Sequence, residues 1–254
     1  MATSTGKEYR LSELKSTTSG RMLLVDTTIT ASLGAVRGLE DLRKAIENIR
    51  DKVTGIILNP GQCERMAGLL GGRGHAVSLV RTDWTNIFRG TDFAIPMETP
   101  SHIMLASGED VLEIGGCAAV AFFLFGYDDD FEAQNIVLIT YLLRECSRIG
   151  MPVMVDVRLN GPKITEANFK ESAALAVSFM QEGGADVISI PYPGEDVFKT
   201  IMEFATVPIL LRETNPHVIE TGIKLGASGA VLSEEILASD NFMNEIDAIR
   251  KLVV

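Results

Sequence analysis

The sequence has few cysteines and no cysteine motif. Its three cysteines, Cys63, Cys117 and Cys146, lie far apart and show no C-x-x-C spacing. A sparse, odd set argues against a disulfide framework and against a cysteine zinc site, and it is typical of reduced cytosolic thiols.

Long apolar runs and nucleotide-binding motifs are also missing. No run approaches the roughly 18 apolar residues of a transmembrane helix, and no cationic-then-apolar signal peptide opens the sequence. The longest apolar stretch, 117–125, has the length of a buried strand with its flanks. Neither G-x-G-x-x-G after the first strand nor G-x-x-x-x-G-K is present. We therefore expect a cytoplasmic protein that has no membrane partner and does not bind a nucleotide in this way.

The sequence has fewer basic than acidic residues. Lysine and arginine number 23 against 34 aspartates and glutamates, which gives a net charge of −11. Nucleic acid is therefore not expected as a partner, because a phosphate backbone requires a basic surface. A strongly anionic substrate is also disfavoured, unless a local basic pocket overrules the overall charge.

What the sequence does contain is a repeated unit, clearest at 183–194. Gly183 and Gly184 suit the end of a helix, a β-branched run follows over 187–190, and Pro191, Pro193 and Gly194 close it. Similar strands are expected at 22–25, 55–58, 75–80, 118–125, 153–157, 208–211 and 228–232. Helices are expected at 39–51, 63–70, 107–114, 131–149, 168–182, 195–205, 216–225 and 242–253.

About eight units of this kind, with strands apolar on both faces, predict a parallel sheet covered by helices. In a chain of 254 residues they fit an α/β fold of the (β/α)8 TIM barrel type better than an open sheet. We expect one barrel over 1–254, with 1–21 as a polar, partly helical lead-in segment.

Five segments carry a resemblance to a known family: MLLVD at 22–26, ILNPG at 57–61, CSRIGMPV at 146–153, GADVISIPY at 184–192 followed by Gly194, and GASGA at 226–230. In this order and spacing the chain resembles the class I aldolases grouped with archaeal-type fructose-bisphosphate aldolase, deoxyribose-phosphate aldolase and the autoinducer-2 thiolase. The resemblance implies a barrel and a homo-oligomer, since members commonly assemble into rings or double rings.

The chain departs from that family at its chemical positions. The family carries a Schiff-base lysine on the sixth strand, where this chain has Ser189, and a serine hydroxyl cannot form an iminium. Asp26 matches the family, but Thr27 stands in place of its histidine. Asp156 and Arg158 occupy the positions of a tryptophan and a tyrosine.

The family's phosphate site is also altered. Its glycines and its Gly-Arg pair are replaced by Arg212 and Glu213 after the seventh strand and by Ser233 and Glu234 after the eighth. Carboxylates at these places would repel a phosphate, so we expect a small, polar, non-phosphorylated carbonyl substrate.

The polar residues at the strand ends form the candidate site. Because the carboxyl ends of barrel strands meet at one face, we expect these side chains to converge there. Asp26, Asp156, Arg158, Ser189 and Tyr192 are the candidate catalytic residues. Arg81, Asp83, Arg212, Glu213, Ser233 and Glu234 are the candidate substrate-binding residues.

Each of these interpretations has an alternative. The charges could form a structural salt-bridge network, and Asp26 could cap its loop and not act as a base. Ser189 fits a small filler better than a nucleophile. Lys163 fits an exposed loop lysine better than a relocated Schiff base. The three histidines, His75, His102 and His217, are expected to be structural.

No cofactor and no metal are expected. Asp26, Asp156, Glu213 and Glu234 could offer oxygen ligands to Mg²⁺ or Mn²⁺, but the arginines between them argue against such a site. Two functions remain open. One is an aldolase-like carbon–carbon lyase, or related carbonyl and enolate chemistry, without the sixth-strand lysine. The other is a catalytically silent barrel that binds a ligand or acts as a scaffold or regulator.

Overall fold

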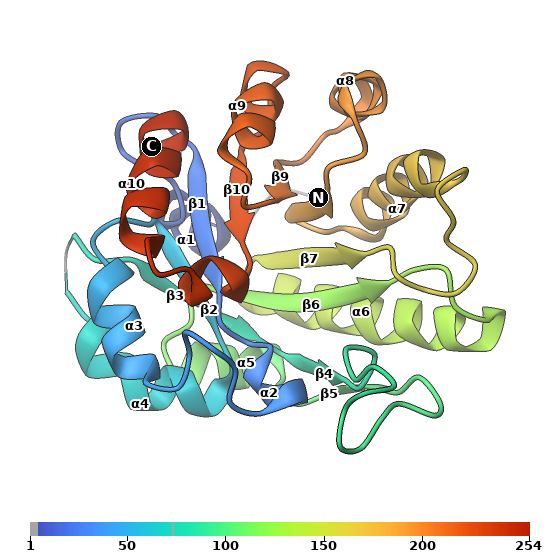
Figure 1. The fold of residues 1–254 in the computed structure, drawn as a ribbon, viewed down its shortest axis with the longest axis horizontal. Helices are drawn as coiled ribbons and strands as arrows, with labels where there is room; N and C mark the ends of the chain where they lie inside the picture. The colour runs from blue at the N-terminus through green and yellow to red at the C-terminus, as the bar shows by residue number, and fades with distance from the viewer. Residues whose placement is uncertain (1–4, 73) are drawn as a thin grey trace.

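The computed structural model describes residues 5–72 and 74–254, and within them eight parallel strands close into a barrel (Figure 1). Around the barrel the strands follow one another in chain order, and the last pairs with the first. The predicted (β/α)8 barrel is confirmed. Its strands are β1 (Met22–Asp26), β2 (Gly55–Leu58), β3 (Val77–Arg81), β6 (Ala118–Leu124), β7 (Val153–Arg158), β8 (Val187–Pro191), β9 (Ile209–Arg212) and β10 (Gly229–Leu232).

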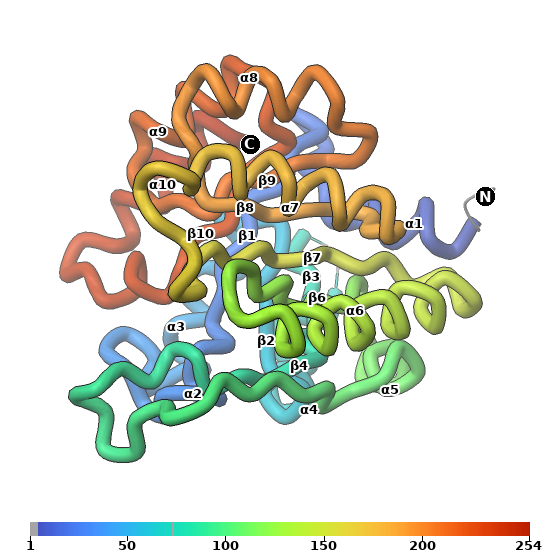
Figure 2. Tube along the Cα trace, turned by 90° about the vertical axis from the view of Figure 1, so that its right-hand side faces the viewer, coloured from blue at the N-terminus to red at the C-terminus, as the bar shows by residue number. Residues whose placement is uncertain are grey.

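Helices follow the strands and cover the outside of the barrel (Figures 1 and 2). They are α2 (Thr30–Leu33), α3 (Leu42–Ile49), α4 (Pro60–Leu70), α5 (Gly108–Glu113), α6 (Asp129–Ile149), α7 (Phe169–Gly183), α8 (Glu195–Phe204), α9 (Pro216–Lys224), the 3-10 helix η1 (Glu234–Ala238) and α10 (Phe242–Val253). Among the described residues, none of these helices combines the length and apolar character that a membrane span needs.

The helix α6 illustrates how local sequence sets these boundaries. Asp128 caps its first turn by accepting a hydrogen bond from the backbone N–H of Phe131. Acidic side chains follow in that turn, where they meet the positive end of the helix dipole. Gly150 ends the helix in the left-handed conformation, at φ 67°.

Alternating strand residues divide the apolar side chains into two cores. One set points outward and packs against the helices, for example Leu23, Ile56 and Val155. The other points into the barrel, for example Leu24, Leu79 and Met154. Because side chains alternate along a strand, the polar residues two positions further on continue the inward column toward the carboxyl ends.

The helix α1 (Thr5–Glu13) closes the amino-terminal end of the barrel. Leu14, which follows it, is 1% exposed and packs with the inward-facing apolar residues. Lys7 forms an ion pair of 2.9 Å with Asp186, which precedes β8. Figure 2 shows α1 at the opposite end of the barrel from α2. The polar lead-in is thus an anchored helix over its described part, and residues 1–4 lie outside the described range.

Two short strands lie outside the barrel and were not predicted. β4 (Asp83–Thr85) and β5 (His102–Met104) pair antiparallel, with Asp83 opposite Met104 and Thr85 opposite His102. Residues 86–101 form the loop between them, at the lower right of Figure 1. This excursion brings the segment 102–104 back to the end of β3.

Candidate active site

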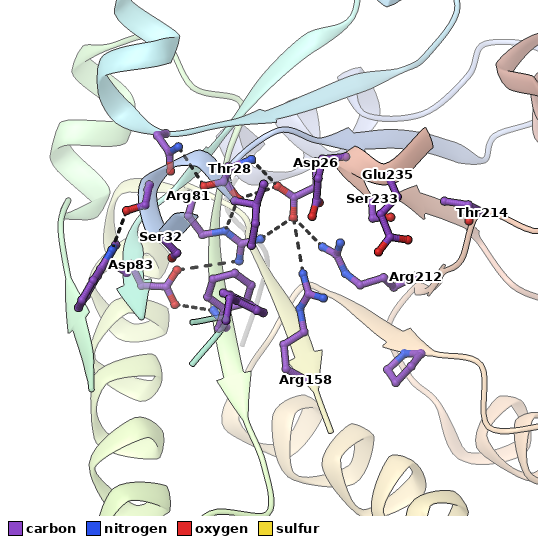
Figure 3. Close-up of a pocket in the computed structure, with 18 of the residues that line it drawn as sticks. Asp26, Thr28, Ser32, Arg81, Asp83, Arg158, Arg212, Thr214, Ser233 and Glu235 are labelled. Atoms are coloured by element: carbon purple, nitrogen blue, oxygen red, sulfur yellow. Dashed lines mark hydrogen bonds and ion pairs between the residues drawn. The ribbon is translucent and has the colours of Figure 1, made fainter. Parts of the chain in front are cut away.

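A cavity of about 400 Å³ lies at the carboxyl ends of the barrel strands (Figure 3). Barrel enzymes carry their active sites at this face, and the volume is at the small end of the usual range for ligand pockets. The charged residues that line it are Asp26, Arg81, Asp83, Arg158, Arg212, Glu213, Glu234 and Glu235. All eight come from the ends of barrel strands or from the segments that follow them.

Asp26 is held by donors on both of its carboxylate oxygens. Oδ1 accepts hydrogen bonds from the backbone N–H and the hydroxyl of Thr28, at 3.0 and 2.6 Å. Oδ2 accepts from Nη2 of Arg81 at 2.9 Å and from Nη2 of Arg212 at 2.8 Å. Nη2 of Arg158 lies 3.9 Å from the same oxygen. Figure 3 shows the three guanidinium groups pointing toward Asp26.

Asp156 lies deeper and is fully buried. Its Oδ1 accepts hydrogen bonds from the Ser189 hydroxyl at 2.8 Å and from Nε of Arg212 at 2.9 Å. Its Oδ2 accepts from Nη2 of Arg81 at 3.0 Å and from Nη2 of Arg212 at 2.5 Å, with Nη2 of Arg158 3.3 Å away. No oxygen of Asp156 is left without a donor.

Both aspartates stay ionised despite their burial. Burial opposes ionisation of Asp26, but the guanidinium groups of Arg81 and Arg212 outweigh it and lower the pKa from 3.8 to about 2. Burial likewise opposes ionisation of Asp156, and the same arginines together with Arg158 lower its pKa. A carboxylate with so low a pKa, and with every oxygen occupied, is a poor general base near neutral pH.

Burial and neighbouring charges shift the pKa values of Arg158 and Arg212 in opposite directions. Burial, followed by the repulsion of Arg212, lowers the pKa of Arg158 to about 10. Burial also disfavours the charged form of Arg212, but Asp156 and Asp26 outweigh it and raise its pKa. The guanidinium of Arg81 stacks on the Phe122 ring, 3.6 Å from its centroid.

Each of the three arginines keeps one buried nitrogen that has no hydrogen-bond partner among the described residues. These atoms are Nη1 of Arg81, Nε of Arg158 and Nη1 of Arg212. Buried donors are almost always paired, and each unpaired one is costly. Three such donors around one cavity indicate a site built to bind a hydrogen-bond acceptor.

A histidine that the sequence did not mark as functional lies beside this cluster, with its side chain 2% exposed. His102, on β5, places Nε2 2.7 Å from Oδ2 of Asp83, and its Nδ1 lies 2.8 Å from Nδ2 of Asn135 on α6. The backbone N–H of Phe122 donates to the same Asp83 oxygen at 2.5 Å. His102 was expected to be structural because the three histidines are scattered at strand or helix starts. Its partners lie 19 and 33 residues away in the chain, so no local pattern marks them.

The rim of the cavity is acidic. Oε1 of Glu213 accepts from the backbone N–H groups of Thr214 and Asn215, at 2.8 and 2.9 Å. Glu234 also lines the cavity, and burial, followed by the charge of Asp26, raises its pKa. Glu234 is therefore better matched to proton transfer near neutral pH than Asp26 is.

Asp156 and three further residues singled out from the sequence lie outside the cavity lining. Ser189 is fully buried beneath the cavity, where its hydroxyl donates a hydrogen bond to Asp156. Tyr192 points to the outer side of β8, with its ring 5.9 Å from that of Phe198. Lys163 is exposed and pairs with Asp129 at 2.5 Å. Within the described ranges no three histidine, cysteine or acidic side chains are grouped so as to hold a metal ion.

Comparisons with known proteins give a consistent result. Residues 21–238 match the family described as "DeoC/LacD family aldolase". A 2-amino-3,7-dideoxy-D-threo-hept-6-ulosonate synthase from Halobacterium salinarum is 26% identical over 216 residues, which cover 84% of this chain and 76% of that protein.

Solved structures share the fold. A Schiff base-forming fructose-1,6-bisphosphate aldolase superposes with a TM-score of 0.80 at 16% identity, covering 98% of this chain and all of that one. An archaeal fructose 1,6-bisphosphate aldolase superposes with a TM-score of 0.79 at 16% identity, covering 98% and 99% of the two chains. At this identity the likeness concerns the barrel itself.

Proposed function

We propose that this chain, which belongs to the DeoC/LacD family of aldolases, makes or breaks a carbon–carbon bond beside a carbonyl group through an enolate and not through an imine. The observation that carries the proposal is the set of three unpartnered guanidinium nitrogens around the cavity. Aligned cationic donors in a buried site stabilise negative charge that develops on an oxygen during reaction.

The residues around Ser189 support a route without an imine. The cavity lining contains three arginines and no lysine among the described residues. Lys163, the alternative amine close in sequence to a strand end, has 56% of its side chain exposed and is paired with Asp129. The carbanion that an iminium would stabilise must then be stabilised as an enolate, by charge and hydrogen bonds to its oxygen.

The balance of charge argues for a substrate with little negative charge. Arg81, Arg158 and Arg212 are matched by three buried aspartates, so the cluster is close to neutral overall. Glu213 and Glu235 add negative charge at the rim. Such a site suits a small polar carbonyl compound, with at most one carboxylate, better than a sugar bisphosphate.

We assign the enolate oxygen to Arg158. Its closest ion pair, with Asp156, is 3.3 Å long, whereas the closest ion pairs of Arg81 and Arg212 are 2.9 and 2.5 Å. Its side chain is also 22% exposed. It is therefore free to turn its unpartnered Nε toward a ligand. Asp26 and Asp156 hold Arg81 and Arg212 in place, and Glu234 supplies the proton that the enolate carbon takes up.

One observation favours the second candidate function, a catalytically silent barrel that binds a ligand or acts as a scaffold. The network among the arginines, Asp26, Asp156 and Ser189 is internally hydrogen-bonded, as a structural filling of a vacated site would be. The two functions differ in whether the cavity activates a carbon–hydrogen bond.

The deciding experiment follows deuterium uptake from heavy water at the α-carbon of pyruvate, hydroxyacetone and acetone by NMR. We expect exchange with at least one of them, lost in Arg158→Met and kept in Lys163→Ala. Borohydride is expected to trap no ketone on the protein. Binding of these ketones without any exchange would instead support the silent barrel, and a borohydride adduct would overturn the enolate route.

A further inference from the structure

We propose that Asp83 is the base that removes the proton from a substrate hydroxyl group, and that His102 and Asn135 position it. This inference rests on the proposed function, and it adds that the substrate carries a hydroxyl group beside the bond that breaks. The hydroxyl oxygen binds between Oδ1 of Asp83 and Nη1 of Arg81.

Asp83 is distinguished by its unoccupied oxygen. Asp26 and Asp156 have donors on every carboxylate oxygen, as described above. Oδ1 of Asp83, in contrast, is buried and has no hydrogen-bond partner among the described residues. Of the three buried aspartates of the cluster, it therefore has an oxygen lone pair to offer to a ligand.

The other oxygen of Asp83 is fixed by two donors. Oδ2 accepts from the backbone N–H of Phe122 and lies 2.7 Å from Nε2 of His102. The carboxylate plane is thereby set by β6 on one side and β5 on the other, and Oδ1 is left toward the cavity that Asp83 lines. A base that is already oriented loses little freedom when substrate binds.

Asn135 determines which nitrogen of His102 carries the hydrogen. Its Oδ1 accepts from the backbone N–H of Leu124 at 3.0 Å, and its Nδ2 donates to the carbonyl of Phe122 at 3.2 Å. If the amide were turned over, its oxygen would face the carbonyl oxygen of Phe122 and its NH₂ group would face the N–H of Leu124. The orientation of the amide is therefore fixed. Nδ2 therefore donates to Nδ1 of His102 as well, which leaves the hydrogen on Nε2, facing Asp83.

Oδ1 of Asp83 faces the guanidinium group of Arg81. Its Nη1 lies 3.9 Å from Oδ1 of Asp83, too far for a hydrogen bond, and neither atom has a hydrogen-bond partner in the described part of the chain. A hydroxyl oxygen placed beside the pair accepts from Nη1 and donates to Oδ1, which satisfies both buried groups at once. Both side chains are at most 1% exposed, so the hydroxyl would be held away from bulk water.

In the cleavage direction the electrons balance as follows. Oδ1 of Asp83 takes the hydroxyl proton, the O–H electron pair forms a carbonyl, and the adjacent carbon–carbon bond breaks. Its electron pair forms the enolate at Arg158, and the carbon takes a proton from Glu234. Asp83 is left protonated and Glu234 ionised, and each returns to its starting form by exchanging a proton with water.

The first test measures binding and needs no turnover. Dissociation constants of 3-hydroxybutyrate and butyrate, which differ by the hydroxyl group, are measured by calorimetry with the parent chain and with Asp83→Asn. We expect the parent to bind 3-hydroxybutyrate about tenfold or more tightly than butyrate, because one charge-assisted hydrogen bond is gained. The variant is expected to lose this ratio. Equal binding of the two acids by the parent, or binding of neither, overturns the proposal.

The second test separates proton removal from the hydroxyl group from proton exchange at carbon. Asp83→Asn should lower cleavage of 4-hydroxy-2-oxopentanoate by about 100-fold or more, while deuterium exchange into pyruvate changes little. An equal loss of both reactions would make Asp83 a structural residue. If the parent discriminates between the two acids but catalyses neither reaction, the hydroxyl site stands and the proposed enzymatic function fails.

If Asp83→Asn fails to fold, a pair of substitutions at His102 tests the proposal independently. His102→Gln keeps an N–H donor for Asp83 and should retain most cleavage, whereas His102→Phe removes it and should lose cleavage but keep exchange. The matched control is the surface pair of His75 and Asp51, 2.6 Å apart. His75→Phe and Asp51→Asn should change neither reaction, and identical behaviour of His102→Gln and His102→Phe would refute the positioning role.

Discussion

The hydroxyl of Ser189 donates a 2.8 Å hydrogen bond to Oδ1 of Asp156, and both side chains are fully buried. Adjacent parallel strands β7 and β8 set this contact, since the two residues are register partners. A position that the sequence resemblance links to covalent chemistry is thus used here to support an ionised carboxylate.

Ser189→Ala and Ser189→Lys are expected to behave very differently. Alanine removes one of the two donors to Oδ1, so the free energy of unfolding should fall by about 1 kcal/mol with activity retained. Lysine brings a long side chain and a fourth cation into a fully buried position beside three arginines. It should lower the melting temperature by far more than alanine does, and borohydride should still trap no ketone. Differential scanning calorimetry and mass spectrometry make the two measurements; a lysine variant as stable as the parent would contradict this view of the site.

Acid should weaken the fold through Asp26. Because its pKa falls from 3.8 in the unfolded chain to about 2 in the fold, the stabilisation is fully present above about pH 4. It is lost progressively as the pH falls from about 4 to about 2, by about 2 kcal/mol for this residue. Urea unfolding between pH 7 and pH 2 measures the loss.

Asp26→Asn tests the same carboxylate at neutral pH. It leaves the buried guanidinium groups of Arg81 and Arg212 short of a counter-charge, so we expect about 3–5 kcal/mol of destabilisation. The surface control, Asp51→Asn, should stay within about 0.5 kcal/mol of the parent. A similar, small change in both variants would show that the buried ion pairs contribute little.

Arg158 should matter more to activity than to stability. Asp26 and Asp156 keep two arginines each when Arg158 is replaced, so Arg158→Met leaves no buried carboxylate unpaired. We expect kcat for ketone exchange to fall by about 10²–10³, as when one donor to a developing oxyanion is removed. Arg81→Met, which removes a donor from both aspartates, should unfold at clearly lower urea concentration. Comparable stability losses in the two variants would argue against separate roles.

Glu234 should impose a pH dependence on catalysis. Burial and the charge of Asp26 raise its pKa, so its protonated, proton-donating form persists to higher pH than in a free glutamate. The rate of cleavage, in which Glu234 donates a proton to the enolate carbon, should therefore decline as the pH rises through that raised pKa. Glu234→Gln should lower the rate by about 10²–10⁴ and remove this limb of the pH profile. Glu220→Gln, at an exposed ion pair on α9, should keep both the rate and the limb.

Much of the barrel and of the charged cluster could be predicted from the sequence. Short β-branched runs followed by polar residues mark the strands, and closure of a parallel barrel necessarily brings their carboxyl ends to one face. This is why Asp26, Arg81, Asp156, Arg158 and Arg212, scattered over the chain, meet there. The family resemblance is confirmed by the match over residues 21–238.

The orientation of single side chains was harder to predict. Pro191 lines the cavity, so Tyr192, the next residue along, points to the opposite face of the strand, and Ser189 lies one layer deeper than the lining. His102 and Asn135 reach Asp83 only because β5 returns to pair with β4 and α6 packs beside them. A strand of three residues after a long loop leaves no periodic signal.

Leu14 and the inward-facing apolar layer above it fill the amino-terminal part of the barrel, and the cavity lies at the strands' carboxyl ends. The two fragments of the proposed cleavage would leave through the carboxyl ends, one after the other. The hydroxyl half would sit at Arg81, 1% exposed, and the enolate half at Arg158, 22% exposed. The ketone fragment would leave first and the aldehyde last, so in steady-state kinetics of the synthetic direction the aldehyde binds ahead of the ketone.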